Sequence, residues 1–192
     1  MYYFTKDRVL IIILTLIFFI PYSQNYPQNN ILIGPNFQKS QNSSKKIIYS
    51  IPNGWTRDVD SIKKMGVSDI LVPKGKSIQN TNMAILVTFQ KKNPAIEGLS
   101  TLKQFFRVDV ENTLARFPDT KFARWQPKSL NPDKINFMSI EIYGENGNEP
   151  SPQNLLMIDS GDGYYSISLT TENRYSLQLP IFIDFFNGIS LE

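Results

Sequence analysis

The chain has 192 residues, of which 41% are hydrophobic and 19% are charged. This composition is typical of a globular protein and excludes a disordered or collagen-like chain. The length predicts a single domain with a substantial core. The formal net charge is +3 and falls to +2 without residues 1–23. Because so weak a charge creates little attraction for phosphate backbones, we expect no nucleic-acid partner.

The sequence contains neither cysteine nor histidine. Nucleophilic centres of the serine–histidine and cysteine–histidine kinds are therefore excluded, and zinc sites lose their usual ligands. A conventional lipoprotein is excluded as well, because no cysteine is present to be acylated. The glycine-rich motifs of phosphate-binding loops are also missing from the sequence. We therefore expect no catalytic residue, no metal ligand and no cofactor.

The N-terminus has the pattern of an export signal. Lys6 and Arg8 precede an apolar run from Val9 to Ile20, which Pro21 ends. A membrane-spanning helix needs about 20 apolar residues, and this run is much shorter. A short apolar run behind basic residues is typical of a signal peptide. The sequence therefore predicts export.

Export divides the chain into three parts. Residues 1–23 are the predicted signal peptide, residues 24–46 form a polar linker rich in Asn, Gln and Ser, and residues 47–192 form one domain. We expect the domain to be periplasmic or secreted. The alternative is an uncleaved N-terminal anchor, in which residues 9–20 alone contact the membrane.

Short apolar or β-branched runs separated by turn residues predict about seven strands in the domain. These strands comprise residues 47–51, 70–72, 83–90, 121–125, 135–143, 155–159 and 164–171. The run 83–90 is apolar on both faces and is therefore predicted to be central.

Two helices are predicted beside these strands. The first runs from an N-cap at Ser100 to Phe117, with an apolar stripe that includes Phe106. The second opens at Pro180 and carries an aromatic stripe on one face. Hairpin-length links join the last strands. The chain is therefore predicted to be an α+β domain, a mainly antiparallel sheet of about six to seven strands covered by two long helices.

The order of several short motifs resembles a known fold. Ile51-Pro-Asn-Gly-Trp55 is followed by Leu71-Val-Pro-Lys-Gly-Lys-Ser77, a strand that ends at Thr88-Phe89, and a helix that opens at Leu99-Ser-Thr-Leu102. With the closing Phe-rich helix, this order resembles the Mog1/PsbP-like fold, and within it small exported bacterial proteins of unknown function. The resemblance implies a layered sandwich over residues 47–190.

Members of this fold serve as accessory or binding modules, among them a nuclear-transport partner, a photosystem subunit and bacterial envelope proteins. The resemblance therefore implies a binding or accessory role. It brings no shared catalytic residue, and a fold does not by itself define a function.

Four lysines form the candidate partner surface. Lys74 and Lys76 follow the second predicted strand, and Lys91 and Lys92 follow the third. If the strand ends meet, these side chains form a basic patch that contacts phosphate, an acidic partner or anionic lipid. The alternative is that they are separate solubilising charges at strand ends.

Two further features have an ordinary structural explanation. Trp55 and Trp125 are candidate recognition aromatics, but Trp55 follows a glycine turn and is expected to pack at the edge of the core. The segments Asp159–Gly163 and Glu145–Pro150 are rich in oxygen ligands. Neither has the spacing of a calcium loop, so a hairpin turn and a solvated connection are predicted instead.

The sequence combines an export signal with no recognisable set of catalytic residues. This combination predicts a non-catalytic binding or accessory protein of the bacterial cell envelope. Its partner would be another envelope or exported protein, contacted through an edge strand or the loop Lys74–Asn82. Two alternatives remain open. An immunity or chaperone-like protein that masks another exported protein predicts one contiguous apolar patch. A hydrolase with paired carboxylates predicts a pocket lined by two acids with shifted pKa values.

Overall fold

The structure is a computed structural model that describes residues 32–33, 45–95, 100–144 and 150–192. The predicted signal peptide, residues 1–23, and most of the connection Glu145–Pro150 lie outside the described residues. Within the described ranges, no helix is long and apolar enough to cross a membrane.

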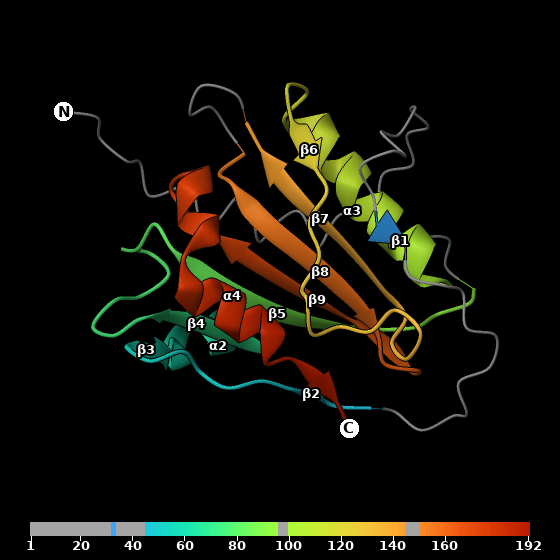
Figure 1. Ribbon diagram of the computed structural model, residues 1–192, viewed down its shortest axis with the longest axis horizontal. Helices are drawn as coiled ribbons and strands as arrows, with labels where there is room; N and C mark the ends of the chain where they lie inside the picture. The colour runs from blue at the N-terminus through green and yellow to red at the C-terminus, as the bar shows by residue number, and fades with distance from the viewer. Residues whose placement is uncertain (1–31, 34–44, 96–99, 145–149) are drawn as a thin grey trace.

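The domain is built on one antiparallel sheet. Its strands, in chain order, are β1 (Leu32–Ile33), β3 (Trp55–Arg57), β4 (Asp69–Pro73), β5 (Ala84–Lys91), β6 (Lys121–Ala123), β7 (Phe137–Tyr143), β8 (Gln153–Asp159) and β9 (Gly163–Thr170). Their order across the sheet is β1-β7-β8-β9-β5-β4-β3, and β6 also pairs with β7 (Figure 1). β1 lies within the segment predicted as a linker.

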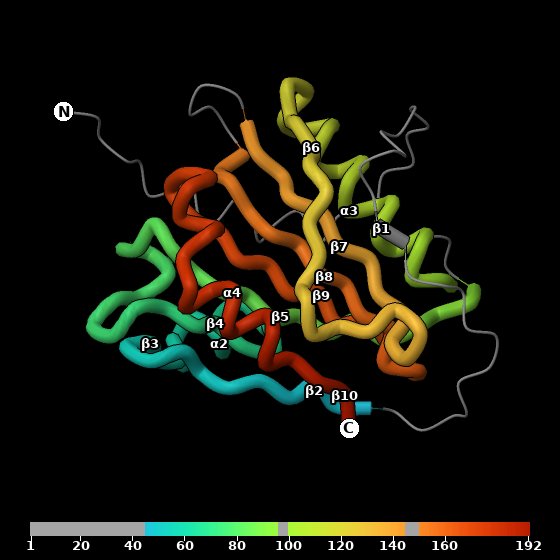
Figure 2. The backbone as a smooth tube through the Cα atoms, viewed as in Figure 1, coloured from blue at the N-terminus to red at the C-terminus, as the bar shows by residue number. Residues whose placement is uncertain are grey.

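A second, two-stranded ribbon ties the start of the domain to its end. β2 (Ile47–Ile48) pairs with β10 (Ser190–Leu191). The tube in Figure 2 shows these two segments side by side near the C-terminus. The predicted strand 47–51 is shorter than expected, because only Ile47 and Ile48 pair with the partner strand. Tyr49 and Ile51, which follow, pack against the core.

Three α-helices and one 3-10 turn complete the described structure: α2 (Val59–Met65), α3 (Leu102–Arg116), η3 (Arg174–Gln178) and α4 (Pro180–Asn187). The α+β class is confirmed, but only α3 is long, and α2 was not predicted. The N-cap of α3 is Thr101, whose hydroxyl accepts from the Gln104 N–H at 3.2 Å, and not Ser100.

The helices cover opposite faces of the sheet. α3 packs on the face of β7 and β8 that presents Ile140 and Met157, and α2 packs beside it on the same face, over β4 and β5. α4 packs on the other face, against Ile85, Leu156 and Ile167. The sheet is therefore the middle layer of three, and strands at its centre are buried on both sides.

Asp109 on α3 is half-buried, and loss of water around its carboxyl raises its pKa to about 7. A raised pKa in the folded state means that the folded protein binds more protons than the unfolded chain between about pH 4 and pH 7. Stability is therefore expected to fall as pH rises through this window.

Replacing Asp109 with asparagine should remove that loss. Between pH 4.5 and pH 7.5, we expect the free energy of unfolding of Asp109→Asn to rise by on the order of 2 kcal/mol relative to that of the native chain. The whole pKa shift corresponds to a larger change, but Asp109 keeps some contact with water, which weakens the effect. Urea unfolding at both pH values measures it. The exposed Asp119→Asn is the control, and equal pH profiles for both variants would contradict the expectation.

Candidate functional site

A cavity of about 240 Å³ opens on the face of the sheet that α4 covers. Its walls come from the segment between β6 and β7, from strand β8, and from η3 and α4. The lining residues are Trp125, Gln126, Pro127, Lys128, Asn154, Leu177, Gln178, Phe182, Ile183, Phe186 and Asn187. None of them is acidic, and Lys128 is the one charged residue among them.

The apolar walls follow from the spacing of residues on α4. Phe182 and Phe186 lie one helical turn apart and are both almost fully buried. The ring of Trp125 meets Phe186 edge to face, with centroids 4.6 Å apart and an interplanar angle of 70°. Leu177 of η3 is also buried beside the cavity. The result is an aromatic slot whose walls support one another.

The segment that carries Trp125 is held at both ends. The Asn187 side-chain oxygen accepts from the backbone N–H groups of Lys128, at 3.0 Å, and Ser129, at 3.3 Å. The Ser139 hydroxyl on β7 donates to the Trp125 carbonyl at 2.6 Å. Because this wall is fixed to both α4 and the sheet, the cavity is preformed.

Asn154 of β8 is the buried polar residue of the cavity. It is 2% exposed, and its Oδ1 atom has no hydrogen-bond partner among the described residues. A buried acceptor without a partner costs about 1–3 kcal/mol. It also lies on the same face of β8 as the core residues Leu156 and Ile158. A polar group in such a place requires an explanation beyond packing.

The acid opposite Asn154 on the neighbouring strand already has a cationic partner. Glu141 lies directly opposite Asn154 on β7. Its carboxylate accepts from Arg174 Nε of η3 at 2.5 Å, and the Arg174 guanidinium stacks 3.6 Å from the centroid of the Tyr143 ring. The pKa of Arg174 is raised, chiefly by its hydrogen bond to Glu141. Glu141 is therefore committed to a structural ion pair.

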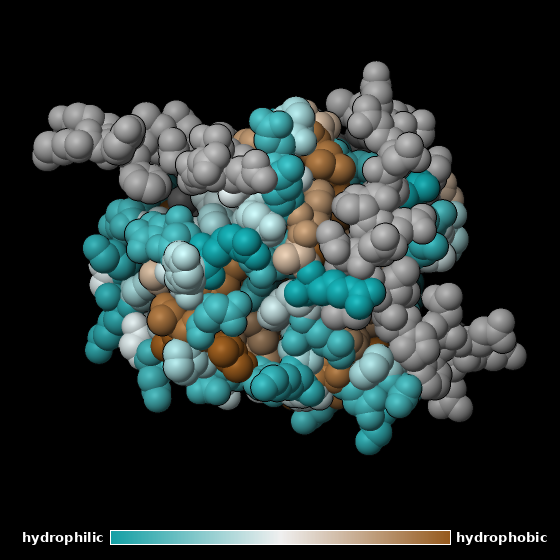
Figure 3. Space-filling model, turned by 45° about the horizontal axis from the view of Figure 1, so that its top comes forward, coloured by the Kyte–Doolittle hydropathy of each residue, from teal (hydrophilic) through white to brown (hydrophobic). Residues whose placement is uncertain are grey.

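Apolar side chains continue from the cavity to the surface. Ile183, at the cavity, and Leu179, one turn before it, are each 41% exposed, and Tyr175 of η3 is 89% exposed. In the view of Figure 3, apolar residues reach the surface in several separate areas among polar ones. The view therefore shows no single large apolar face.

The four predicted surface lysines do not gather in one patch. Lys74 and Lys76 lie in the turn after β4, near the start of β5, and Lys91 and Lys92 lie at the end of β5. An eight-residue strand separates the pairs by roughly 25 Å. In an antiparallel pair, the end of one strand lies beside the start of the other. The C-terminal ends of β4 and β5 therefore lie at opposite ends of the pair. A role in partner binding remains a prediction for each pair.

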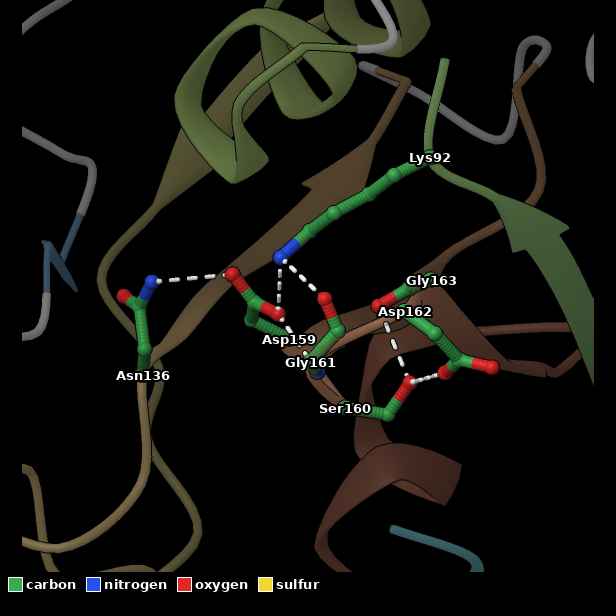
Figure 4. Close-up of polar contacts among 7 residues, drawn as sticks. All are labelled: Lys92, Asn136, Asp159, Ser160, Gly161, Asp162 and Gly163. Carbon is green, nitrogen blue, oxygen red and sulfur yellow. Dashed lines mark hydrogen bonds and ion pairs between the residues drawn. The ribbon is translucent and has the colours of Figure 1, made fainter. Parts of the chain in front are cut away.

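Lys92 is tied into a turn rather than free. Figure 4 shows its side chain reaching from the end of β5 to the turn between β8 and β9. The Lys92 ammonium lies 2.6 Å from Asp159 Oδ1 and donates to the Gly161 carbonyl at 2.9 Å. The Gly161 N–H donates to the same Asp159 oxygen at 2.8 Å. The segment Asp159–Gly163 is therefore a hairpin turn, as predicted, and the structure adds an ion pair that stabilises it.

We expect Lys92→Met to lower the free energy of unfolding by about 1–2 kcal/mol, because it leaves the mostly buried Asp159 carboxylate without its cation. Chemical denaturation measures the change. The neighbouring exposed Lys91→Met serves as the control and should change stability by less than about 0.5 kcal/mol. A loss of the same size in both variants would mean that charge in general, and not this contact, is responsible.

Groups with raised pKa values lie outside the cavity. Tyr49 has a raised pKa, first because it is buried and then because its hydroxyl donates to Asp69 at 2.7 Å. Burial also raises the pKa of Tyr164, with a smaller contribution from Asp159. Asp109 lies on α3, across the sheet from the cavity. In the described part of the chain, no three acidic residues gather as a metal site.

The two tryptophans have different surroundings. Trp55 packs edge to face on Phe182 with centroids 5.5 Å apart, at the margin of the core as predicted. Trp125 is partly buried and forms a wall of the cavity. Sequence reasoning had singled out Trp125 but missed Asn154. In the sequence, Asn154 could have been recognised as a polar residue at a position that belongs to the apolar face of its strand.

No protein-family model matches the chain, and no curated protein matches it. Among solved structures, the chain is similar to the solution structure of cyanobacterial PsbP (CyanoP) from Synechocystis sp. PCC 6803. The two share 13% sequence identity with a TM-score of 0.46, over 83% of this chain and 100% of that chain. This likeness assigns no role to any residue of the chain.

Proposed function

We propose that this chain is an exported, non-catalytic binding protein of the cell envelope that holds its ligand in the cavity beside α4. The observation that carries the proposal is the unpartnered Oδ1 of Asn154 in a preformed aromatic cavity. Apolar walls with a few placed polar groups are typical of ligand sites. Export rests on the signal-peptide pattern of residues 1–23.

The composition of the cavity supports binding over catalysis. A glycosidase-type hydrolase needs two carboxyl groups on either side of the reacting bond, at most about 10 Å apart. The cavity lining contains no acid. Glu141, the acid beside Asn154, is held by Arg174. These residues offer a ligand contacts and orientation, and they do not include the pair of free carboxyl groups that such a hydrolase needs.

The proposal is tested by identifying what the protein carries. The full chain is expressed in its own host, purified as the cell matures it, and denatured, and the released small molecules are identified by mass spectrometry. An Ile183→Trp variant, which fills the cavity mouth, is compared with a Lys74→Gln/Lys76→Gln control. We expect a compound that accompanies the native chain and the control at near-equimolar amounts and is lost from Ile183→Trp. No enrichment over the blocked variant would overturn the proposal.

A second candidate function is the masking of another exported protein. The exposed side chains of Tyr175, Leu179 and Ile183 favour it, because exposed apolar residues beside a cavity are common at protein contacts. Cross-linking in the envelope, followed by mass spectrometry, tests it with Leu179→Lys and a Val59→Lys control on the opposite face. A partner captured by the control and lost from Leu179→Lys supports masking, and equal capture by both excludes it.

A further inference from the structure

We propose that the cavity binds a small planar aromatic acid whose ring carries an N–H or O–H donor, the chemistry of an indole or phenol with a carboxylate substituent. This inference rests on the proposed function, since it names the ligand class of the same cavity. Four properties lead to it: the volume, the shape of the walls, the unpartnered acceptor and the charge at the rim.

The volume limits the part of the ligand that the cavity encloses to one or two rings. An apolar cavity of about 150 Å³ accommodates benzene, and the present cavity is about 240 Å³. Sites for drug-sized ligands begin at about 300 Å³. A nucleotide or a large cofactor is therefore too big to lie wholly within the cavity, whereas a fused bicyclic ring fits.

The walls favour a flat, aromatic ligand. Trp125 and Phe186 meet edge to face at an interplanar angle of 70°, and Phe182 lines the same slot. Aromatic rings prefer offset or edge-to-face neighbours, and a planar ligand makes such contacts on several sides. An aliphatic chain would fill the same space without them.

Asn154 specifies the polar group on the ring. Its Oδ1 is an acceptor, it is buried, and it lacks a partner among the described residues. A ligand that brings an N–H or O–H satisfies it, whereas an equally shaped ligand with no donor leaves it unsatisfied. Sites of this kind discriminate strongly between such pairs, because the cost of the unpaired buried group remains in the wrong complex.

Lys128 specifies the charge of the substituent. It is an exposed residue of the lining, and none of the other lining residues is charged. An anionic group on the ligand can therefore reach a cation at the rim while the ring enters the slot. A cationic substituent would meet only repulsion there.

The test uses two probes of the same shape. Indole-3-acetate carries the ring N–H, and benzofuran-3-acetate replaces it with an oxygen that donates nothing. Isothermal titration of the full chain, purified as the cell matures it and stripped of bound ligand, measures both. We expect indole-3-acetate to bind about tenfold more tightly, because one satisfied buried hydrogen bond is worth about that factor.

Three variants locate the effect. Asn154→Leu should bind the two probes equally, a result that a misfolded protein cannot produce because it would bind neither. Lys128→Gln should weaken both probes about two- to fivefold while keeping their ratio, as expected for an exposed ion pair. Lys134→Gln, an exposed charge outside the lining, is the control and should change nothing.

Each outcome of these titrations either supports or overturns the proposed ligand class. A tenfold preference that Asn154→Leu abolishes supports it, and the comparison of probes in the native chain stands even if that variant does not fold. Equal binding of both probes by the native chain overturns the donor requirement, and binding of neither overturns the ligand class. The proposed function is judged separately, because the compound released from the native protein reveals a ligand of any chemistry.

Discussion

Replacing Phe106 with alanine is expected to lower the free energy of unfolding by about 3–5 kcal/mol, the usual cost of emptying a buried aromatic site. Phe106 is 0% exposed and lies in the middle of the stripe by which α3 packs on the sheet. Its neighbours Ile140 and Met157 are on strands paired on both sides and therefore have little freedom to close the space. The loss is a large part of the 5–15 kcal/mol that stabilises a typical domain.

Urea unfolding followed by circular dichroism measures this change. Val59→Ala on α2 is the matched control, because Val59 is 51% exposed and should cost less than about 0.5 kcal/mol. A loss of less than 1 kcal/mol for Phe106→Ala would show that α3 is not the element that closes this face of the sheet.

The second large effect is expected at Gly163, where β9 begins. A Cβ atom at this position would overlap the ring of Phe89 and lie 2.7 Å from the Gln90 carbonyl oxygen of the neighbouring strand. Phe89 comes from the diagonal position on β5 and covers the glycine. We expect Gly163→Ala to cost about 2–3 kcal/mol, in the range of overpacked cores.

A double variant separates the two contacts. Phe89 is 39% exposed, so its ring can be removed at moderate cost. In the Phe89→Ala background, Gly163→Ala should cost clearly less than in the native chain, and the remaining cost should reflect the Gln90 carbonyl, which cannot move without disturbing the sheet. Thermal unfolding of the four proteins measures the coupling. Additive changes would mean that the ring already moves aside freely.

Local sequence patterns were sufficient for most of the strands and for α3 and α4, but not for α2. Strands 83–90 and 164–171 are observed within one residue of their predicted ends, because β-branched runs bounded by turn residues specify them locally. α2 was missed, although Asp58 caps it by accepting from the Ser61 N–H at 3.1 Å and Gly66 ends it with φ 65°. With seven residues, it has too little periodicity to be detected.

Asn154 was missed for a different reason. The strand was predicted to begin at Leu155, whereas the structure begins it at Gln153. The two added residues pair with Ile142 and Glu141 on β7, so a neighbouring strand and not the local sequence extends it. Once Asn154 belongs to the strand, the alternation of faces points it toward α4.

The sequence by itself determined the α+β class, the positions of the main strands and the absence of cysteine and histidine chemistry. These follow from composition and from periods of a few residues, which a single segment carries alone. Only the tertiary structure decided that Lys74 and Lys92 lie at opposite ends of β5, and that Trp125, Asn154 and Phe186 surround one cavity. Those three residues come from different elements, and their meeting depends on strand order and on the face that each element presents, which no local pattern encodes.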